Sequence, residues 1–103
     1  MKCLLCLSAI FVLSLSLSQP AFSQSAADLY KSKCQMCHGA DGKGGTPVAK
    51  TMGVRDFKSP DVAKESAADM IALTKNGKNK MPAYKDKLTD EQIKDLVTYI
   101  RGL

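Results

Sequence analysis

The chain has 103 residues, of which 45% are hydrophobic and 24% are charged, a composition typical of one small globular domain and not of a disordered chain or a membrane bundle. Its formal net charge is +5, from 15 lysines and arginines against 10 acidic residues. Because the lysines are scattered along the chain, this charge does not indicate binding to nucleic acid, and a surface that docks an acidic partner fits better.

The N-terminus has the order of regions found in a secretory signal. Met1-Lys2 precedes an apolar run over residues 3–17, and the small-residue pattern Ala21-Phe22-Ser23 follows it. The run is shorter than the ~20 apolar residues that a membrane-spanning helix needs. We therefore predict a signal peptide over residues 1–23, cleaved after Ser23, that exports the domain of residues 24–103 to the periplasm.

Cleavage would also remove Cys3 and Cys6, which leaves the domain two cysteines and four aromatic side chains. Domains with so thin an apolar core usually need a disulfide, a metal or a cofactor to stabilise them. We therefore expect something other than side chains to fill the middle of the fold.

The first half of the domain is predicted as a helix followed by a long loop. Good helix formers without glycine or proline predict a helix from about residue 25 to about residue 35. Residues 39–53 contain five glycines and Pro47, a composition that favours neither helix nor strand. We expect a loop there, continued through residues 55–60.

The second half is predicted as two helices. Ser66 can cap a helix of about ten residues that ends before Gly77. The clearest helix covers residues 89–101, because Thr89 and Gln92 form a capping-box pair at its start. Its apolar residues recur at helical spacing: Ile93, Leu96, Val97 and Ile100. Since no stretch alternates with the period of a strand, we predict an all-α domain with three main helices.

Cys34, Cys37 and His38 form the pattern C-x-x-C-H, and His38 is the only histidine of the chain. Zinc needs three or four ligands, and the domain offers no further cysteine or histidine. A thioredoxin-like couple belongs beside a strand, and a disulfide across two residues closes too short a loop to stabilise much. Two thiols at this spacing can instead add to the two vinyl groups of one porphyrin, with the adjacent imidazole on the iron. We predict one covalent haem c, attached by the two cysteines and ligated by His38.

A methionine is the expected second axial ligand, because a soft thioether stabilises ferrous iron. Met36 lies between the two cysteines, too close to reach the opposite face of a haem. Met70 falls on the apolar stripe of a helix, and Met52 follows His38 by only 14 residues. Met81 follows His38 by 43 residues, in a loop stiffened by a proline. We predict Met81 as this ligand.

Pro47 is the expected partner of the histidine. The second nitrogen of a ligating histidine normally donates to a carbonyl, which fixes the plane of the ring. Pro47 lies near the end of the glycine loop and could place such a carbonyl near His38.

With these residues the chain resembles the class I c-type cytochromes, and among them the small bacterial and cytochrome c6-like electron carriers. The matching stretches are CQMCHGADGKGG, NGKNKMPAY and LTDEQIKDLVTYIRGL. The resemblance covers residues 26–103 and implies a compact cytochrome c fold, in which the first and last helices cross and the haem lies between the His38 and Met81 loops. It also implies that Pro47 orients His38. The residues implied at the helix crossing are Tyr30, Ile93, Leu96, Val97 and Tyr99.

Two filled axial positions leave no open site on the iron, so we predict a soluble one-electron carrier between membrane or periplasmic redox enzymes, and not an enzyme. We expect a monomer without a membrane anchor. Lysines beside the haem-contacting loops could steer its exposed edge toward acidic patches on donors and acceptors. They are Lys43, Lys78, Lys80, Lys85 and Lys87. The alternative is a gas-binding, sensing or weakly peroxidatic haem protein with a labile or absent sixth ligand. A non-haem dithiol module is a further alternative.

We expect the exported protein to begin at Gln24 and to be heavier than the polypeptide of residues 24–103 by one haem. Mass spectrometry of protein purified from the periplasm measures both properties. A mature mass without haem would contradict the prediction, and the dithiol alternative would then account for the motif.

Overall fold

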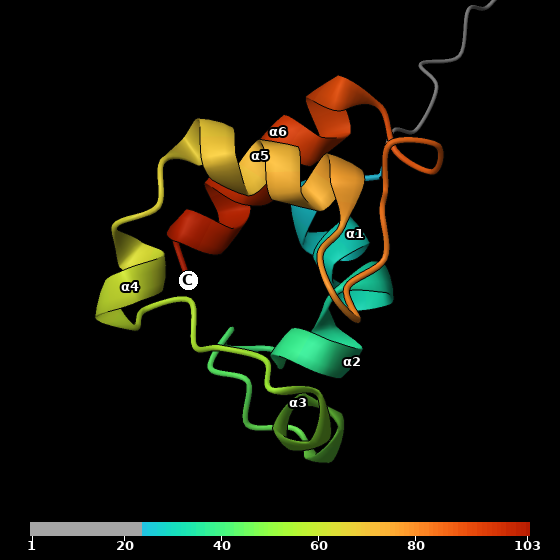
Figure 1. Cartoon of the computed structure of the whole chain (residues 1–103). Coiled ribbons are helices and arrows are strands. Elements are labelled where there is room, and N and C mark those ends of the chain that lie inside the picture. The colour runs from blue at the N-terminus through green and yellow to red at the C-terminus, as the bar shows by residue number, and fades with distance from the viewer. Residues whose placement is uncertain (1–23) are drawn as a thin grey trace, which may run out of the picture.

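The structure is a computed structural model that describes residues 24–103, and the predicted signal peptide of residues 1–23 lies outside the described residues. The described part forms helices and no strand, which confirms the all-α prediction. Figure 1 shows α5 and α6 together at one end of the domain and α2 and α3 at the other. The helices in chain order are α1 (Ala26–Lys33), α2 (Gln35–His38), α3 (Pro47–Met52), α4 (Pro60–Ala63), α5 (Ala67–Asn76) and α6 (Asp90–Arg101). No helix within residues 24–103 has the length and apolar character to cross a membrane.

The helices α5 and α6 begin at the predicted caps, and α1 begins at a cap that was not predicted. Thr89 Oγ1 accepts from the Gln92 amide at 3.1 Å and Gln92 Oε1 accepts from the Thr89 amide at 2.9 Å, which completes the capping box of α6. Ser66 Oγ accepts from the amide of Asp69 at the start of α5, and Ser25 caps α1 in the same way. These local bonds satisfy amides that have no partner inside the helix, so they define where each helix starts.

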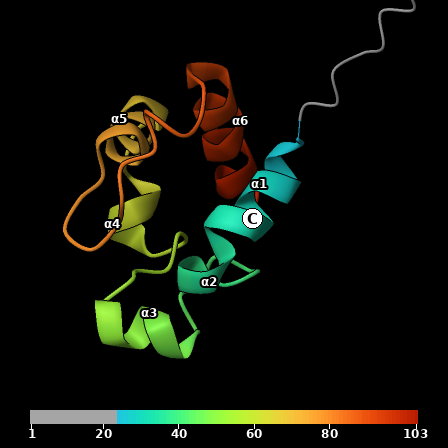
Figure 2. The ribbon, with the colours of Figure 1, turned by 90° about the vertical axis from the view of Figure 1, so that its right-hand side faces the viewer.

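The core lies where α1 and α5 pack against α6, and Figure 2 shows α6 between the other two helices. The ring centroids of Tyr30 and Tyr99 are 5.3 Å apart at the crossing of α1 and α6. This contact confirms the role predicted for the two tyrosines. Val97 is buried but lies outside the main cluster. The buried members of that cluster are Leu29, Tyr30, Leu88, Ile93, Leu96 and Ile100.

The prediction of a loop without helix over residues 39–53 is wrong in its second half, where α3 forms. Four of the five glycines gather in residues 39–45, and the rest of the segment carries its own helix signals. Thr46 Oγ1 accepts from the Ala49 amide at 3.0 Å, Pro47 occupies the first turn, and Gly53 ends the helix at φ +69°. One further turn, α4, begins at Pro60, at the end of the segment expected to continue the loop.

Tyr30 connects the core to the segment that follows α2. Its hydroxyl is buried and donates to the carbonyl of Gly39 at 2.6 Å. The same carbonyl accepts from the Gly42 amide at 3.2 Å. Desolvation by burial is the main reason that the pKa of Tyr30 is raised to about 12, so the hydroxyl stays a donor at neutral pH.

We expect Tyr30→Phe to lower the free energy of unfolding by about 1 kcal/mol, because a buried carbonyl loses one of its two donors. Tyr99→Phe is the matched control, since no hydrogen bond of the Tyr99 hydroxyl is found in the described residues. We expect the control to change stability by less than about 0.5 kcal/mol. Denaturant unfolding of both variants measures the difference, and equal losses would show that the Tyr30 hydroxyl contributes nothing specific.

Candidate haem-binding site

The C-x-x-C-H segment forms the short helix α2, which directly continues α1 after a kink at Cys34. The last carbonyl groups of so short a helix accept no hydrogen bond from within the helix, so they need donors from elsewhere. Thr46 Oγ1 donates to the Cys37 carbonyl at 3.3 Å, and the Gly44 amide donates to the His38 carbonyl at 2.9 Å. Together with the bond from Tyr30 to Gly39, these contacts hold the end of the motif from three sides.

Both thiols of the motif are free and half-buried. Burial is the main reason that the pKa of Cys34 is raised to about 11, so this thiol is protonated at neutral pH. Cysteines that act in redox exchange have lowered pKa values instead, so Cys34 lacks the property that a dithiol redox module needs. Within residues 24–103 there is also no group of three or more His, Cys, Asp or Glu side chains that could hold a metal ion.

A cavity of about 280 Å³ lies beside α2. Its lining includes all four predicted attachment and ligand residues: Cys34, Cys37, His38 and Met81. The rest of its wall is mainly apolar and includes Val54, Phe57, Val62, Leu73 and Ile100. A mainly apolar pocket with a few convergent polar groups is the ordinary setting of a cofactor.

His38 has the properties of an axial ligand. Burial lowers the pKa of its imidazole below the usual range, so the ring is neutral at pH 7 and keeps a free nitrogen lone pair. Its Nδ1 is buried and, among residues 24–103, has no hydrogen-bond partner. The ring is stacked on Phe57, with the centroids 4.6 Å apart and the planes at 16°. The donor set therefore fits a haem iron.

The bond expected between His38 and Pro47 is absent from the structure. Pro47 opens α3 as its first residue, and its carbonyl accepts from Thr51 Oγ1 at 3.2 Å, within the same helix. The unpartnered Nδ1 leaves the orientation of His38 by Pro47 as a prediction.

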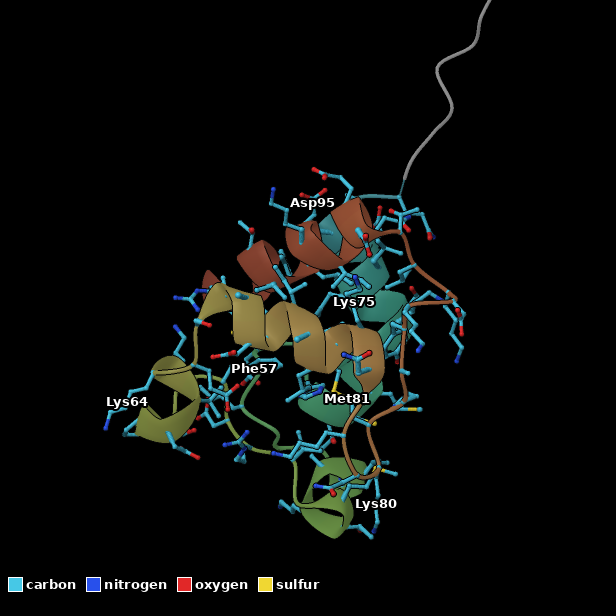
Figure 3. The ribbon with its side chains drawn as sticks, turned by 45° about the horizontal axis from the view of Figure 1, so that its top comes forward. Phe57, Lys64, Lys75, Lys80, Met81 and Asp95 are labelled. Atoms are coloured by element: carbon cyan, nitrogen blue, oxygen red, sulfur yellow. The ribbon has the colours of Figure 1, made fainter. Side chains whose placement is uncertain are left out.

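Met81 is placed by a tight turn after α5. The Lys78 amide donates to the Met81 carbonyl at 3.2 Å, and the Met81 amide donates back to the Lys78 carbonyl at 3.0 Å. Asn79 has φ +53° inside this turn, a conformation that asparagine tolerates better than most residues. Figure 3 shows Lys80 at the tip of the turn and Met81 away from the tip, near the end of α5.

The segment after Met81 is tied to the helices on both sides of the cavity. The Tyr84 amide donates to the Thr74 carbonyl of α5 at 3.1 Å, and the Tyr84 hydroxyl donates to the Lys33 carbonyl at the end of α1 at 3.1 Å. Tyr84 itself lines the cavity. The methionine therefore sits on a turn whose two ends are held.

The other methionines divide into two groups. Met52 and Met70 line the same cavity as Met81, and the side chain of Met70 also packs against the core. Met36 is 75% exposed and does not line the cavity, in agreement with its exclusion from the sequence. The cavity lining by itself therefore does not distinguish among the thioethers of Met52, Met70 and Met81 as the predicted ligand.

Of the five predicted lysines, Lys78 and Lys80 line the cavity. The lining also includes Lys33, which was not among the predicted lysines although it stands next to Cys34. None of these three lysines forms a salt bridge with another residue of the described chain. The remaining predicted members lie away from the cavity lining: Lys43, Lys85 and Lys87.

Arg55 and Phe57 also line the cavity, and no sequence motif predicted this position for them. Arg55 lies at the cavity and binds Asp61 at 2.9 Å and Glu65 at 3.2 Å. These hydrogen bonds raise the pKa of Arg55 and lower the pKa of Asp61. Both candidates lie in an irregular segment, where no periodicity shows which side chain turns inward.

Known proteins similar to this chain carry the names of cytochromes. Residues 21–100 match the protein family described as cytochrome c oxidase, cbb3-type, subunit III. Cytochrome c6 of Nostoc sp. (strain PCC 7120) is 36% identical over 101 residues, which cover 95% of this chain and 88% of that protein. Cytochrome c6 of Anabaena variabilis is 34% identical over 85 residues, which cover 80% of this chain and 92% of that protein.

Two solved structures resemble the fold. The KustC0563 c-type cytochrome matches with a TM-score of 0.71 and 33% identity, over 77% of this chain and 96% of that chain. Cytochrome c6C from Synechococcus sp. PCC 7002 matches with a TM-score of 0.59 and 28% identity, over 77% of this chain and 93% of that chain.

We expect Gly77→Ala to displace Met81, because the added Cβ would lie 2.6 Å from the Met81 carbonyl oxygen and 2.9 Å from the Ala83 amide nitrogen. Backbone atoms cannot yield as a flexible side chain does. The holoprotein should lose at least about 2 kcal/mol of stability. It should also lose the weak red absorption band of a thioether-ligated ferric haem.

Gly53→Ala is the matched control for Gly77→Ala. Both glycines have φ near +70°, but Gly53 has ψ 34°, in the left-handed helical region, whereas Gly77 has ψ 172°, in a region that is essentially closed to other residues. Alanine therefore costs roughly 1 kcal/mol at Gly53 and more than that at Gly77. At Gly53 the added Cβ meets no atom within 4 Å. A red band that survives in Gly77→Ala, or vanishes in both variants, would contradict the placement of Met81.

Proposed function

This chain belongs to the c-type cytochromes, as a small class I member similar to cytochrome c6. We propose that it carries single electrons on a haem ligated by His38 and Met81. Family membership confirms the predicted cytochrome c fold, with α1, α5 and α6 as its main helices. It also establishes one covalently bound haem c and an electron-transfer role in place of an enzymatic one.

The proposal rests on one observation, the cavity that is lined by the C-x-x-C-H helix and by the turn holding Met81. These two segments are far apart in sequence, and only the fold brings both to one cavity. The thiols of Cys34 and Cys37 are available to tether a haem there. The neutral imidazole and the thioether are the two axial ligands that suit low-spin iron.

The protein's own contribution is to bind, orient and exclude water. Haem c supplies a one-electron iron couple when it is bound. The mainly apolar lining would lower the local polarity around a bound haem, which would disfavour additional charge there and so favour ferrous iron. The thioether of Met81 acts in the same direction, because a soft ligand stabilises the reduced metal. If His38 and Met81 both ligated the iron, no open position would remain there for oxygen or peroxide.

The rim of the cavity suits a negatively charged partner. Lys33, Lys78 and Lys80 are exposed, line the cavity and form no salt bridge within residues 24–103. Met52 adds an apolar side chain that is 42% exposed at the same cavity. We infer that donors and acceptors dock here through acidic patches, and that Lys43, Lys85 and Lys87 contribute from farther away.

The proposed setting is the periplasm, reached by cleavage of residues 1–23 after Ser23. The N-terminal pattern of charged, apolar and small residues supports this part of the proposal. Covalent attachment of haem to an exported monomer would yield a carrier that diffuses between membrane or periplasmic redox enzymes.

We expect Met81→Ala to retain covalent haem but to open the sixth position. The reduction potential should fall by an amount on the order of 0.1 V, because axial ligands tune haem potentials over about 0.8 V. Ferrous Met81→Ala protein should bind carbon monoxide readily, whereas the unmodified protein should not. Spectroscopy and redox titration of the periplasmically matured protein measure these properties.

Met52→Ala is the matched control, since it removes the same side chain from the same cavity. We expect its spectrum and potential to match those of the unmodified protein. An effect confined to Met52→Ala would identify Met52 as the ligand. Carbon monoxide binding by the unmodified protein would favour the gas-binding alternative.

We expect electron transfer to the anion ferricyanide to slow as salt is added, because the rim charges are exposed and are screened within about 10 Å at 0.1 M ionic strength. Lys80→Glu should lower the rate at least about two-fold at low salt, since it reverses a charge at the cavity. Stopped-flow oxidation of the ferrous protein measures the rate.

Lys64→Glu makes the same charge change away from the cavity. Figure 3 shows Lys64 beside α4 and Lys80 beside the Met81 turn. The control should retain most of the rate. Rates that are independent of salt, or that fall equally in both variants, would remove the argument for docking at this rim.

A further inference from the structure

Phe57 is the aromatic side chain in contact with the histidine of the motif. The two ring centroids lie 4.6 Å apart, and the ring planes are only 16° from parallel. The other aromatic side chain of the cavity wall is Tyr84, and within the described residues it forms no ring pair with His38. Phe57 therefore presents the flat surface against which the imidazole lies.

The position of Phe57 is itself closely held. Its backbone amide donates to the Gly42 carbonyl at 3.0 Å. Its ring occupies space that a side chain at Gly42 would need, because a Cβ there would lie 2.6 Å from Phe57 Cδ2 and 3.2 Å from Leu103 Cδ1. The glycine loop therefore provides both an anchor and a niche for this ring, which Figure 3 shows near α4.

In the described part of the structure the ring of His38 forms no hydrogen bond of the kind that usually fixes a ligating imidazole, and its orientation by Pro47 stays a prediction. Such a ring normally donates its second N–H to a carbonyl or carboxylate, which sets the ring plane. Here Nδ1 is buried without a partner in residues 24–103. The backbone of His38 is fixed by the Gly44 amide, but that bond does not restrict rotation of the side chain.

We propose that Phe57 is a positioning residue that fixes the plane of the His38 imidazole by stacking on it. This role rests on the proposed function, because it matters for electron transfer only if His38 ligates the iron. The imidazole plane decides which iron orbitals the ligand overlaps. It therefore governs the unpaired-spin distribution of the ferric haem, which the g-values and the haem methyl shifts report.

The first test uses the unmodified holoprotein. In the diamagnetic ferrous state, we expect nuclear Overhauser contacts between the ring protons of Phe57 and those of His38. Their absence would overturn the proposal. This measurement does not depend on Met81, whose ligation is read separately from the upfield-shifted methyl resonance of a bound methionine.

The second test compares Phe57→Leu with Phe57→Tyr. The leucine variant keeps an apolar side chain but has no flat face, so we expect shifted g-values and a changed spread of the four haem methyl resonances. The methionine methyl signal should persist, because the Met81 turn is untouched. The tyrosine variant keeps the stacking face and should restore the pattern of the unmodified protein.

Tyr99→Leu is the matched control. Tyr99 and Phe57 are both half-buried aromatic residues packed against the core cluster, but Tyr99 contacts Tyr30 and does not line the cavity. We expect Tyr99→Leu to lower stability without changing the haem signals. An unchanged spectrum in Phe57→Leu, or an equal change in Tyr99→Leu, would overturn the proposal. If Phe57→Leu does not retain haem, the nuclear Overhauser contacts between Phe57 and His38 in the unmodified protein decide whether the proposal stands.

Discussion

The carbonyl groups at the C-terminal end of α2 need hydrogen-bond donors, and this requirement ties three separate parts of the chain to the C-x-x-C-H segment. Thr46 from the start of α3, the Gly44 amide from the glycine loop and Tyr30 from α1 supply them. Tyr30 also packs on Tyr99, so the same side chain links the crossing of α1 and α6 to the residue that follows His38. The position of His38 thus depends on the core, although the two are separate in sequence.

The cofactor site and the apolar core share side chains. Phe57, Met70, Tyr84 and Ile100 line the cavity and also belong to the core cluster or pack against it. A domain of this size buries little apolar surface of its own. A haem tethered to Cys34 and Cys37 would remain on the unfolded chain as well, so it would stabilise the fold through the apolar surface that it buries in the cavity, and the fold in return would restrain His38 and Met81. This sharing explains why a domain with four aromatic residues forms a single packed unit.

Local features were predictable because they depend on neighbouring residues. The caps of α1, α5 and α6 involve residues three apart, and the thiols and imidazole of the motif are adjacent. The helix α3 was not predicted, because the high glycine content of residues 39–45 dominates the composition of the whole segment of residues 39–53. Thr46-Pro47 and Gly53 mark the two ends of this helix in the sequence. The partner of His38 was missed for a different reason. Phe57 lies in an irregular segment, and its ring reaches the imidazole only because Gly42 leaves space for it.

The sequence by itself determined the all-α class and the capped starts of α5 and α6, and it predicted haem attachment at Cys34 and Cys37 with His38 beside them. Tertiary structure decided which distant side chains share the cavity. It brought Met81, Met52 and Met70 to the lining of one cavity, added Lys33 to that lining, and left Lys85 away from it. The physical reason is that spacing along the chain fixes only nearby geometry. Contacts between distant segments depend on how helices pack and where glycines let loops turn back.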